Sequence, residues 1–302
     1  MENRTRPHRF VELLQQRATA GSVVILDGAV GTELDNRGAN THAATWTALA
    51  SLDSPSLLSR IHREYVSAGA DIITANTFRT TRHAFERAGI GGEAWRDAAR
   101  SAVRLAREAA GEAALVAGSV APLEDCFSPH DAPAYRAAYE AHRMLCTVLV
   151  DAGVDILWLE TFGTIEEARA AVDAANASSD GQVPVAVSFT TKKDGALISG
   201  ESLADASVLM AESGVAAISV NCIPWTHVSP ALAILEQSTR LPIGVYANLG
   251  IPEESQDWEG SAYLSPDVYA EMAKEWGARL IGGCCGSTPA HIKALSDAFV
   301  RP

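Results

Sequence analysis

Residues 215–222 read VAAISVNC, an apolar run that closes on Asn221 and Cys222. The pattern returns in PIGVYAN at 242–248 and in RLIGGC at 279–284, and a helical pattern separates each run from the next. Strands of a parallel sheet are covered on both faces by the helices that connect them, so they read as continuous apolar runs. These three runs therefore predict neighbouring parallel strands joined by helices.

Five further runs of the same kind come earlier in the chain. Eight βα units within 302 residues match a closed (β/α)8 TIM barrel, and we predict one α/β domain over 1–302 with an N-terminal arm or helix at 1–20. An open doubly wound sheet is the alternative, but residues 27–31, DGAVG, lack the spacing of a dinucleotide fingerprint. The earlier runs are SVVILD (22–27), ADIITAN (70–76), AALVAGS (113–119), VDILWLE (154–160) and PVAVSFT (184–190).

The composition is that of a globular protein, with 47% hydrophobic and 20% charged residues. No apolar stretch approaches the ~18 residues of a membrane span, and the start, MENRTRPHRF, has no apolar signal region, so we expect a cytoplasmic protein without a membrane partner. A net charge of -13 argues against nucleic acid as a partner. Five cysteines without disulfide-like spacing fit a reducing compartment, and a homo-oligomer stays open.

Polar residues gather where the predicted strands end. In a barrel of this type the catalytic groups lie at the carboxyl ends of the strands, so these residues are expected on one rim. Cysteines from the sixth and eighth strands can meet there because only the seventh strand separates them. In strand order the rim residues are Asp27, Thr74, Asn76, Thr77, Ser119, Glu160, Thr161, Asn221, Cys222, Asn248, Cys284 and Cys285.

Cys284 and Cys285 are adjacent and lie among glycines, in the sequence GGCCG. Neighbouring strand residues point to opposite faces, so both thiols can face one metal only where the strand gives way to an irregular turn, which glycine permits. With Cys222 they would supply three thiolates to a tetrahedral zinc ion and leave one position for a substrate. The alternative is that these cysteines are small buried hydrophobes. We predict a zinc site.

Six motifs stand out in the chain: LDGAVGTEL (26–34), ANTF (75–78), LWLET (157–161), VNC (220–222), YANLG (246–250) and GGCCGSTPAHI (282–292). Together they resemble the homocysteine S-methyltransferases, a family of zinc-bearing (β/α)8 barrels that includes S-methylmethionine-dependent and betaine-dependent enzymes. The resemblance implies that Cys222, Cys284 and Cys285 bind zinc and that Asp27 and Glu160 hold the homocysteine amino group. It also places Asn248 where some members supply an oxygen to zinc until substrate arrives.

Other polar positions have two interpretations. Thr77 and Ser119 either bond the substrate carboxylate or satisfy local backbone, and Asn248 is either a zinc ligand or a turn former. Trp46 lies where family members place an aromatic residue near the methyl donor, although it can equally hold its loop against the barrel. His227, five residues after Cys222, is expected to be a solvated loop residue and not a ligand.

We therefore predict zinc-dependent methyl transfer from a small sulfonium donor, S-methylmethionine or S-adenosylmethionine, to L-homocysteine, giving methionine. Betaine or a corrinoid is the alternative donor. From a different class, the chain could be a non-catalytic zinc or thiol redox sensor, which does not require Asp27 and Glu160. A zinc hydrolase is disfavoured because soft thiolate ligands suit a sulfur substrate better. The long connections at 32–55, 122–133 and 249–264 are expected to be binding loops on the same rim.

Overall fold

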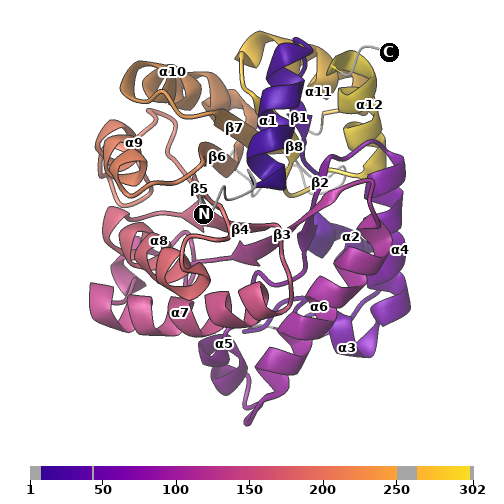
Figure 1. Ribbon diagram of the computed structural model, residues 1–302, viewed down its shortest axis with the longest axis vertical. Helices are drawn as coiled ribbons and strands as arrows, with labels where there is room; N and C mark the ends of the chain where they lie inside the picture. Colours follow the sequence, from indigo (N-terminus) through magenta and orange to yellow (C-terminus); the bar gives the residue numbers. More distant parts are fainter. Residues whose placement is uncertain (1–7, 43, 250–263, 300–302) are drawn as a thin grey trace, which may run out of the picture.

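The computed structural model describes residues 8–42, 44–249 and 264–299, and it shows eight parallel strands in one sheet (Figure 1). The strands follow the order β1-β8-β7-β6-β5-β4-β3-β2, and a bridge between Leu26 and Ile72 joins the two ends of the sheet. The predicted (β/α)8 barrel is confirmed, and the open doubly wound sheet is excluded. The strands are β1 (Val24–Ile25), β2 (Ile72–Ala75), β3 (Leu115–Val120), β4 (Ile156–Phe162), β5 (Val185–Phe189), β6 (Ala217–Pro224), β7 (Ile243–Asn248) and β8 (Leu280–Gly283).

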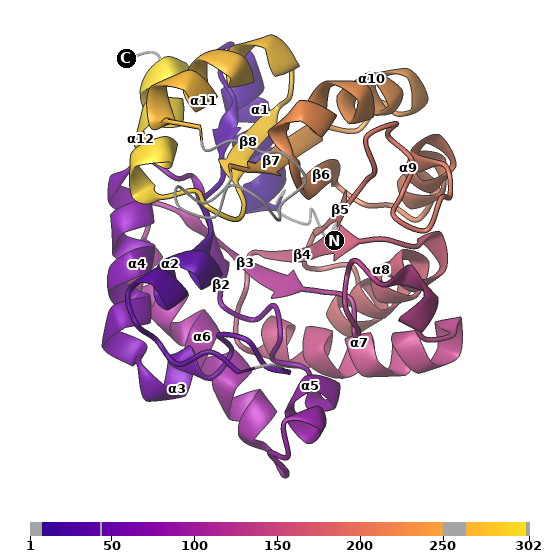
Figure 2. The same ribbon diagram turned by 180° about the vertical axis from the view of Figure 1, so that it is seen from behind.

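Helices form a ring around the strands, as Figures 1 and 2 show from the two sides. Three of them begin with the proline that favours a first helical position, at Pro55, Pro266 and Pro289. The helices are α1 (Arg9–Thr19), α2 (Val30–Asn36), α3 (Ala50–Asp53), α4 (Pro55–Ser67), α5 (Arg82–Arg87), α6 (Ala94–Ala110), α7 (Tyr135–Asp151), α8 (Ile165–Ser179), α9 (Leu203–Glu212), α10 (Val228–Ser238), α11 (Pro266–Ala273) and α12 (Pro289–Phe299), with short 3-10 turns η1 (Pro129–Asp131), η2 (Trp225–His227) and η3 (Lys274–Trp276).

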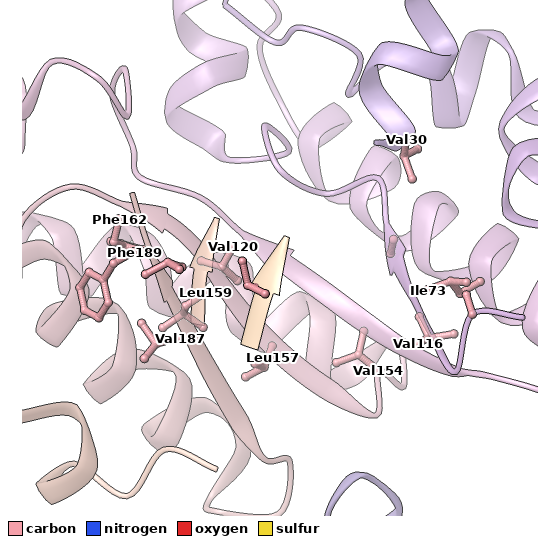
Figure 3. Packing of buried hydrophobic residues seen from close by; sticks show 14 of the residues in the cluster. Val30, Ile73, Val116, Val120, Val154, Leu157, Leu159, Phe162, Val187 and Phe189 are labelled. Atoms are coloured by element: carbon pink, nitrogen blue, oxygen red, sulfur yellow. The ribbon is translucent and has the colours of Figure 1, made fainter. Parts of the chain in front are cut away.

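The core has two parts, one on each side of the barrel wall. Outward-facing strand residues such as Leu157 and Val187 pack against the surrounding helices (Figure 3). Inside the barrel, Trp158 and Tyr246 pack edge to face, and Phe10 of α1 packs against Trp158 with ring centroids 6.2 Å apart. Helix α1 thus places an apolar side chain in the barrel interior, so the space below the carboxyl-end rim is filled.

Two strands become irregular at their carboxyl ends. The pairing register shifts between Leu159 and Phe162 in β4 and between Asn221 and Pro224 in β6. A bulge of this kind re-aims the side chains beside it. Within these two bulges Thr161 and Cys222 have φ angles of 65° and 54°, a left-handed conformation that is uncommon for residues other than glycine.

The structure describes nearly all of two predicted binding loops but only the ends of the third. The connection 32–55 contains most of α2 and the whole of α3, and 122–133 contains η1. Most of the third connection, residues 250–263, lies outside the described residues.

Among the helices that the structure describes, none is long and apolar enough to cross a membrane.

Candidate metal centre and substrate pocket

One cavity lies at the carboxyl ends of the strands, and the ends of β1, β2, β3, β4, β6 and β8 supply its polar lining. Of the residues that the sequence singles out, this cavity brings together Asp27, Trp46, Ser119, Glu160, Cys222, Cys284 and Cys285. Apolar walls come from Trp158, Tyr246 and Phe78. The cavity therefore combines three thiols and two carboxyl groups with aromatic surfaces.

The three thiols lie close enough to share one ion. The Sγ atoms of Cys222 and Cys285 are 3.9 Å apart, and the three sulfur atoms all lie within 4.8 Å of one another. A tetrahedral zinc ion with bonds of ~2.3 Å to sulfur requires sulfur atoms about 3.8 Å apart. The cysteines are free, so this cluster is not a disulfide. Its geometry and its soft donor atoms fit zinc.

Local backbone features bring the thiols together. Cys222 reaches the cavity through its left-handed conformation in the β6 bulge. After β8 the chain turns sharply, with the Ser287 amide donating to the carbonyl of Cys284 at 2.9 Å. A Cβ atom on Gly283 would lie 2.4 Å from the Cβ of Ser287, so only glycine fits below this turn. Hydrogen bonding with the Cys222 and Cys284 thiols lowers the pKa of the Cys285 thiol.

Asp27 is a buried carboxyl group, 5% exposed, at the end of β1. Its two oxygens accept hydrogen bonds from the backbone amide of Thr74 at 2.7 Å and from the Thr74 hydroxyl at 3.0 Å. Burial raises the pKa of Asp27 to about 7, although the Thr74 hydrogen bonds act in the opposite direction. Thr74 was on the predicted rim, but its role as the partner of Asp27 could not be read from the sequence.

Glu160 is the second carboxyl group, and it lies at the β4 bulge. Burial raises its pKa to about 7, while hydrogen bonds from Ser119 and Tyr246 lower it. No cationic side chain of the described residues is among the groups that shift the pKa of Asp27 or Glu160. One buried and one partly buried carboxyl group, both without a cationic partner, can therefore accept a cation from a ligand.

Ser119 and Tyr246 act on Glu160 from different strands. The Ser119 hydroxyl donates to Oε1 of Glu160 and is therefore engaged before any substrate carboxylate arrives. Tyr246 is a site residue that sequence reasoning missed, although it lies in the YANLG motif. Its hydroxyl also accepts a hydrogen bond from Nε1 of Trp158 at 2.8 Å. The pair supports Glu160 from inside the barrel.

Trp46 holds its loop against the barrel and also lines the cavity, while its place near the methyl donor stays a prediction. Its ring stands edge to face with Phe78 at 6.2 Å, and both residues line the cavity. A Cβ on Gly31 would lie 2.2 Å from the Trp46 ring, so the indole also packs directly onto α2. Aromatic faces of this kind attract cations such as sulfonium and ammonium groups.

Thr77, Asn248 and His227 lie outside this cavity among the described residues. Thr77 is fully buried and donates to the Ser119 carbonyl at 2.8 Å, so its hydroxyl satisfies the backbone of the neighbouring strand β3. Asn248 lines a second cavity that shares Cys222 with the first, and its buried Oδ1 has no hydrogen-bond partner among the described residues. His227 is only 7% exposed, so the prediction that it is solvated was wrong, because η2 turns it toward the second cavity.

Comparison with known proteins agrees with this geometry. Residues 24–299 match the family model described as homocysteine S-methyltransferase. The chain is 31% identical to homocysteine S-methyltransferase YbgG of Bacillus subtilis, over 91% of this chain and 93% of that one. It is also 31% identical to homocysteine S-methyltransferase 1 of Zea mays, over 92% and 95%.

Among solved structures, the metallated form of the homocysteine methyltransferase MmuM from Escherichia coli superimposes with a TM-score of 0.80. That protein is 31% identical and the match covers 94% of this chain and 99% of that one. The agreement extends over the barrel as a whole. The chain belongs to the homocysteine S-methyltransferase family and is a methyltransferase that acts on homocysteine.

Proposed function

We propose that this enzyme transfers a methyl group from a small sulfonium donor, S-methylmethionine or S-adenosylmethionine, to L-homocysteine and that it uses zinc. The observation that carries the proposal is the pairing, in one cavity, of three free thiols within 4.8 Å of one another with the Asp27 and Glu160 carboxyl groups, which lack a cationic partner. One end of the cavity suits a soft metal and the other suits an ammonium group.

Cys222, Cys284 and Cys285 would hold the zinc ion, with a fourth position left for the substrate. Zinc, when bound, supplies a deprotonated thiolate at neutral pH, where a free thiol is mostly protonated. The E. coli relative has been solved in a metallated form, which supports a metal in this enzyme. The matching sulfur separations support zinc in this chain.

Asp27 and Glu160 would bind the homocysteine ammonium group by charge-assisted hydrogen bonds. Since each has a pKa of about 7 without a ligand, an incoming cation favours the ionised carboxylate and binds best above that pH. Binding the amino group at two fixed points orients the sulfur of homocysteine toward the thiol cluster. This reduces the entropy that the reacting groups must lose in the transition state.

The donor would be held against the aromatic wall of Trp46 and Phe78, which suits a cationic methyl donor. In the reaction a new bond forms between the homocysteine sulfur and the methyl carbon while the bond from that carbon to the donor sulfur breaks. The donor leaves as a neutral thioether, and the thiol proton of homocysteine passes to solvent. Opposite charges disappear in this step, so a cavity that excludes water favours it.

The test is to incubate the zinc-loaded enzyme with homocysteine and one donor at a time, namely S-methylmethionine, S-adenosylmethionine, betaine or methylcobalamin, and to measure methionine. Methionine from a sulfonium donor supports the proposal, and methionine from betaine or methylcobalamin alone would replace the donor class. The redox-sensor alternative is tested by Asp27→Ala, which should strongly impair methyl transfer but leave zinc binding in place. A metal content far below one zinc per chain in active enzyme would refute the zinc assignment.

A further inference from the structure

Asn221 is fully buried and uses its side-chain amide to connect three strands. Its Oδ1 accepts hydrogen bonds from the backbone amide of Thr161 at 3.0 Å and from the Ser188 hydroxyl at 2.7 Å. Its Nδ2 donates to the Thr161 hydroxyl at 2.9 Å. The orientation of the amide is determined, because a backbone N–H can only donate and must therefore face the oxygen. The ends of β4, β5 and β6 are thus tied by one side chain.

The two bulges that shape the cavity are the elements that this amide connects. Thr161 has a φ of 65° and follows Glu160, while Cys222 has a φ of 54° and follows Asn221. A non-glycine residue keeps such a conformation only when surrounding contacts hold it there. The hydrogen bonds between Thr161 and the side chain of Asn221 are contacts of this kind, and Asn221 directly precedes Cys222.

We propose that Asn221 is a positioning residue, which holds Glu160 on β4 and Cys222 on β6 at the separation that homocysteine requires. Glu160 and Cys222 are 62 positions apart in the sequence and lie on strands that are separated by β5, so backbone pairing does not join them directly. The amide of Asn221 spans this gap with the help of Ser188. The inference rests on the proposed function, in which Glu160 binds the ammonium group and Cys222 binds zinc at the other end of the substrate.

The experiment compares Asn221→Ala with wild type and with Asn176→Ala. Asn176 is a matched control because it lies on the outer helix α8, away from the cavity. Its side-chain amide also donates a hydrogen bond, to the Ser213 carbonyl at 3.1 Å. In each protein we would measure zinc affinity by competition with a chromophoric chelator, KM for homocysteine, KM for the donor, and thermal stability. Supporting residues around a metal site commonly change affinity or activity 10- to 100-fold when they are replaced.

For Asn221→Ala we expect at least about a tenfold weaker zinc affinity and about a tenfold higher homocysteine KM, with the donor KM nearly unchanged. Asn176→Ala should change only thermal stability. A lower melting temperature for Asn221→Ala with unchanged zinc affinity and homocysteine KM would show a merely structural role and overturn the inference. An equal rise in both KM values would also contradict it, because it would indicate general distortion of the cavity.

A second variant separates positioning from folding. Glycine adopts positive φ without steric cost, so Thr161→Gly should partly restore the bulge that Asn221→Ala releases. We expect the double variant to have a homocysteine KM about threefold below that of Asn221→Ala alone. No recovery would contradict the coupling between Asn221 and Thr161. If wild type itself neither binds zinc nor makes methionine, the proposed function fails, whereas a normal wild type with an unaffected Asn221→Ala variant refutes only the positioning role.

Discussion

Replacing Asp27 by Asn should stabilise the ligand-free enzyme at alkaline pH while weakening homocysteine binding. The Asn amide can keep both contacts with Thr74, since its oxygen accepts from the backbone amide and its nitrogen can donate to the hydroxyl. The variant therefore removes a buried ionisable group with little change in shape. In the native enzyme, burial raises the pKa of Asp27 from 3.8 to about 7.

The sign of the pH effect follows from this raised pKa. Between about pH 4 and pH 7 the folded protein holds a proton on Asp27 that the unfolded chain has lost, so the Asp27 contribution favours folding at low pH and is lost as pH rises through 7. A shift of about three pKa units corresponds to about 4 kcal/mol above pH 7, as an order of magnitude. The free energy of unfolding of Asp27→Asn should therefore exceed that of wild type by a few kcal/mol at about pH 8 and converge with it toward pH 4.

The assay is urea unfolding of both proteins, in the same metal state and without homocysteine, at several pH values. The difference between the two curves isolates Asp27, because the other titrating groups are common to both proteins. The homocysteine KM of Asp27→Asn should rise about 30-fold, since an ionic hydrogen bond of about 2 kcal/mol is lost. A difference in unfolding free energy that does not change with pH would refute the argument that Asp27 is a desolvated carboxyl group.

Three further results are expected. Cys222→Ser should lose most bound zinc in metal analysis, whereas Cys146→Ser, which replaces a fully buried cysteine on α7, should keep it; equal zinc contents would contradict the assigned ligands. Tyr246→Phe removes a hydrogen bond that lowers the pKa of Glu160, so the homocysteine KM should rise severalfold near pH 7 and recover near pH 8.5; a rise that is independent of pH would exclude this cause. Gly283→Ala places a carbon 2.4 Å from a side-chain carbon in the turn after β8 and should destabilise the protein by about 2 kcal/mol or more in urea unfolding, and an unchanged midpoint would show that this turn adapts freely.

Most of the barrel could be predicted from local patterns, because buried parallel strands leave a continuous apolar run in the sequence. Each of the eight runs overlaps an observed strand, although 22–27 yields only the two residues of β1, and β3, β4 and β6 extend one or two residues past their runs. The bulges could not be predicted in this way. Thr161 and Cys222 are not glycine, and nothing in their local sequence requires a left-handed backbone. Their conformation depends on contacts with residues on other strands.

The candidate site shows the same division. Rim positions follow from where the apolar runs end, and the cavity does bring Asp27, Glu160 and the three cysteines together. The contacts of the surrounding polar residues could not be predicted from the sequence. Ser119 contacts Glu160, Thr77 donates to the Ser119 carbonyl and His227 is buried, and each of these outcomes depends on packing between segments far apart in the chain.

The sequence by itself determined which chemical groups stand at the strand ends, because strand periodicity and motif spacing are properties of short segments. Only the tertiary structure decided which of these groups face one another and how far they are removed from solvent. A pKa near 7 for Asp27 requires burial, and a thiol cluster requires β6 and β8 to meet at one rim. Both are consequences of how the strands pair in the barrel, since desolvation and convergence arise from contacts between strands and not from the order of residues within one.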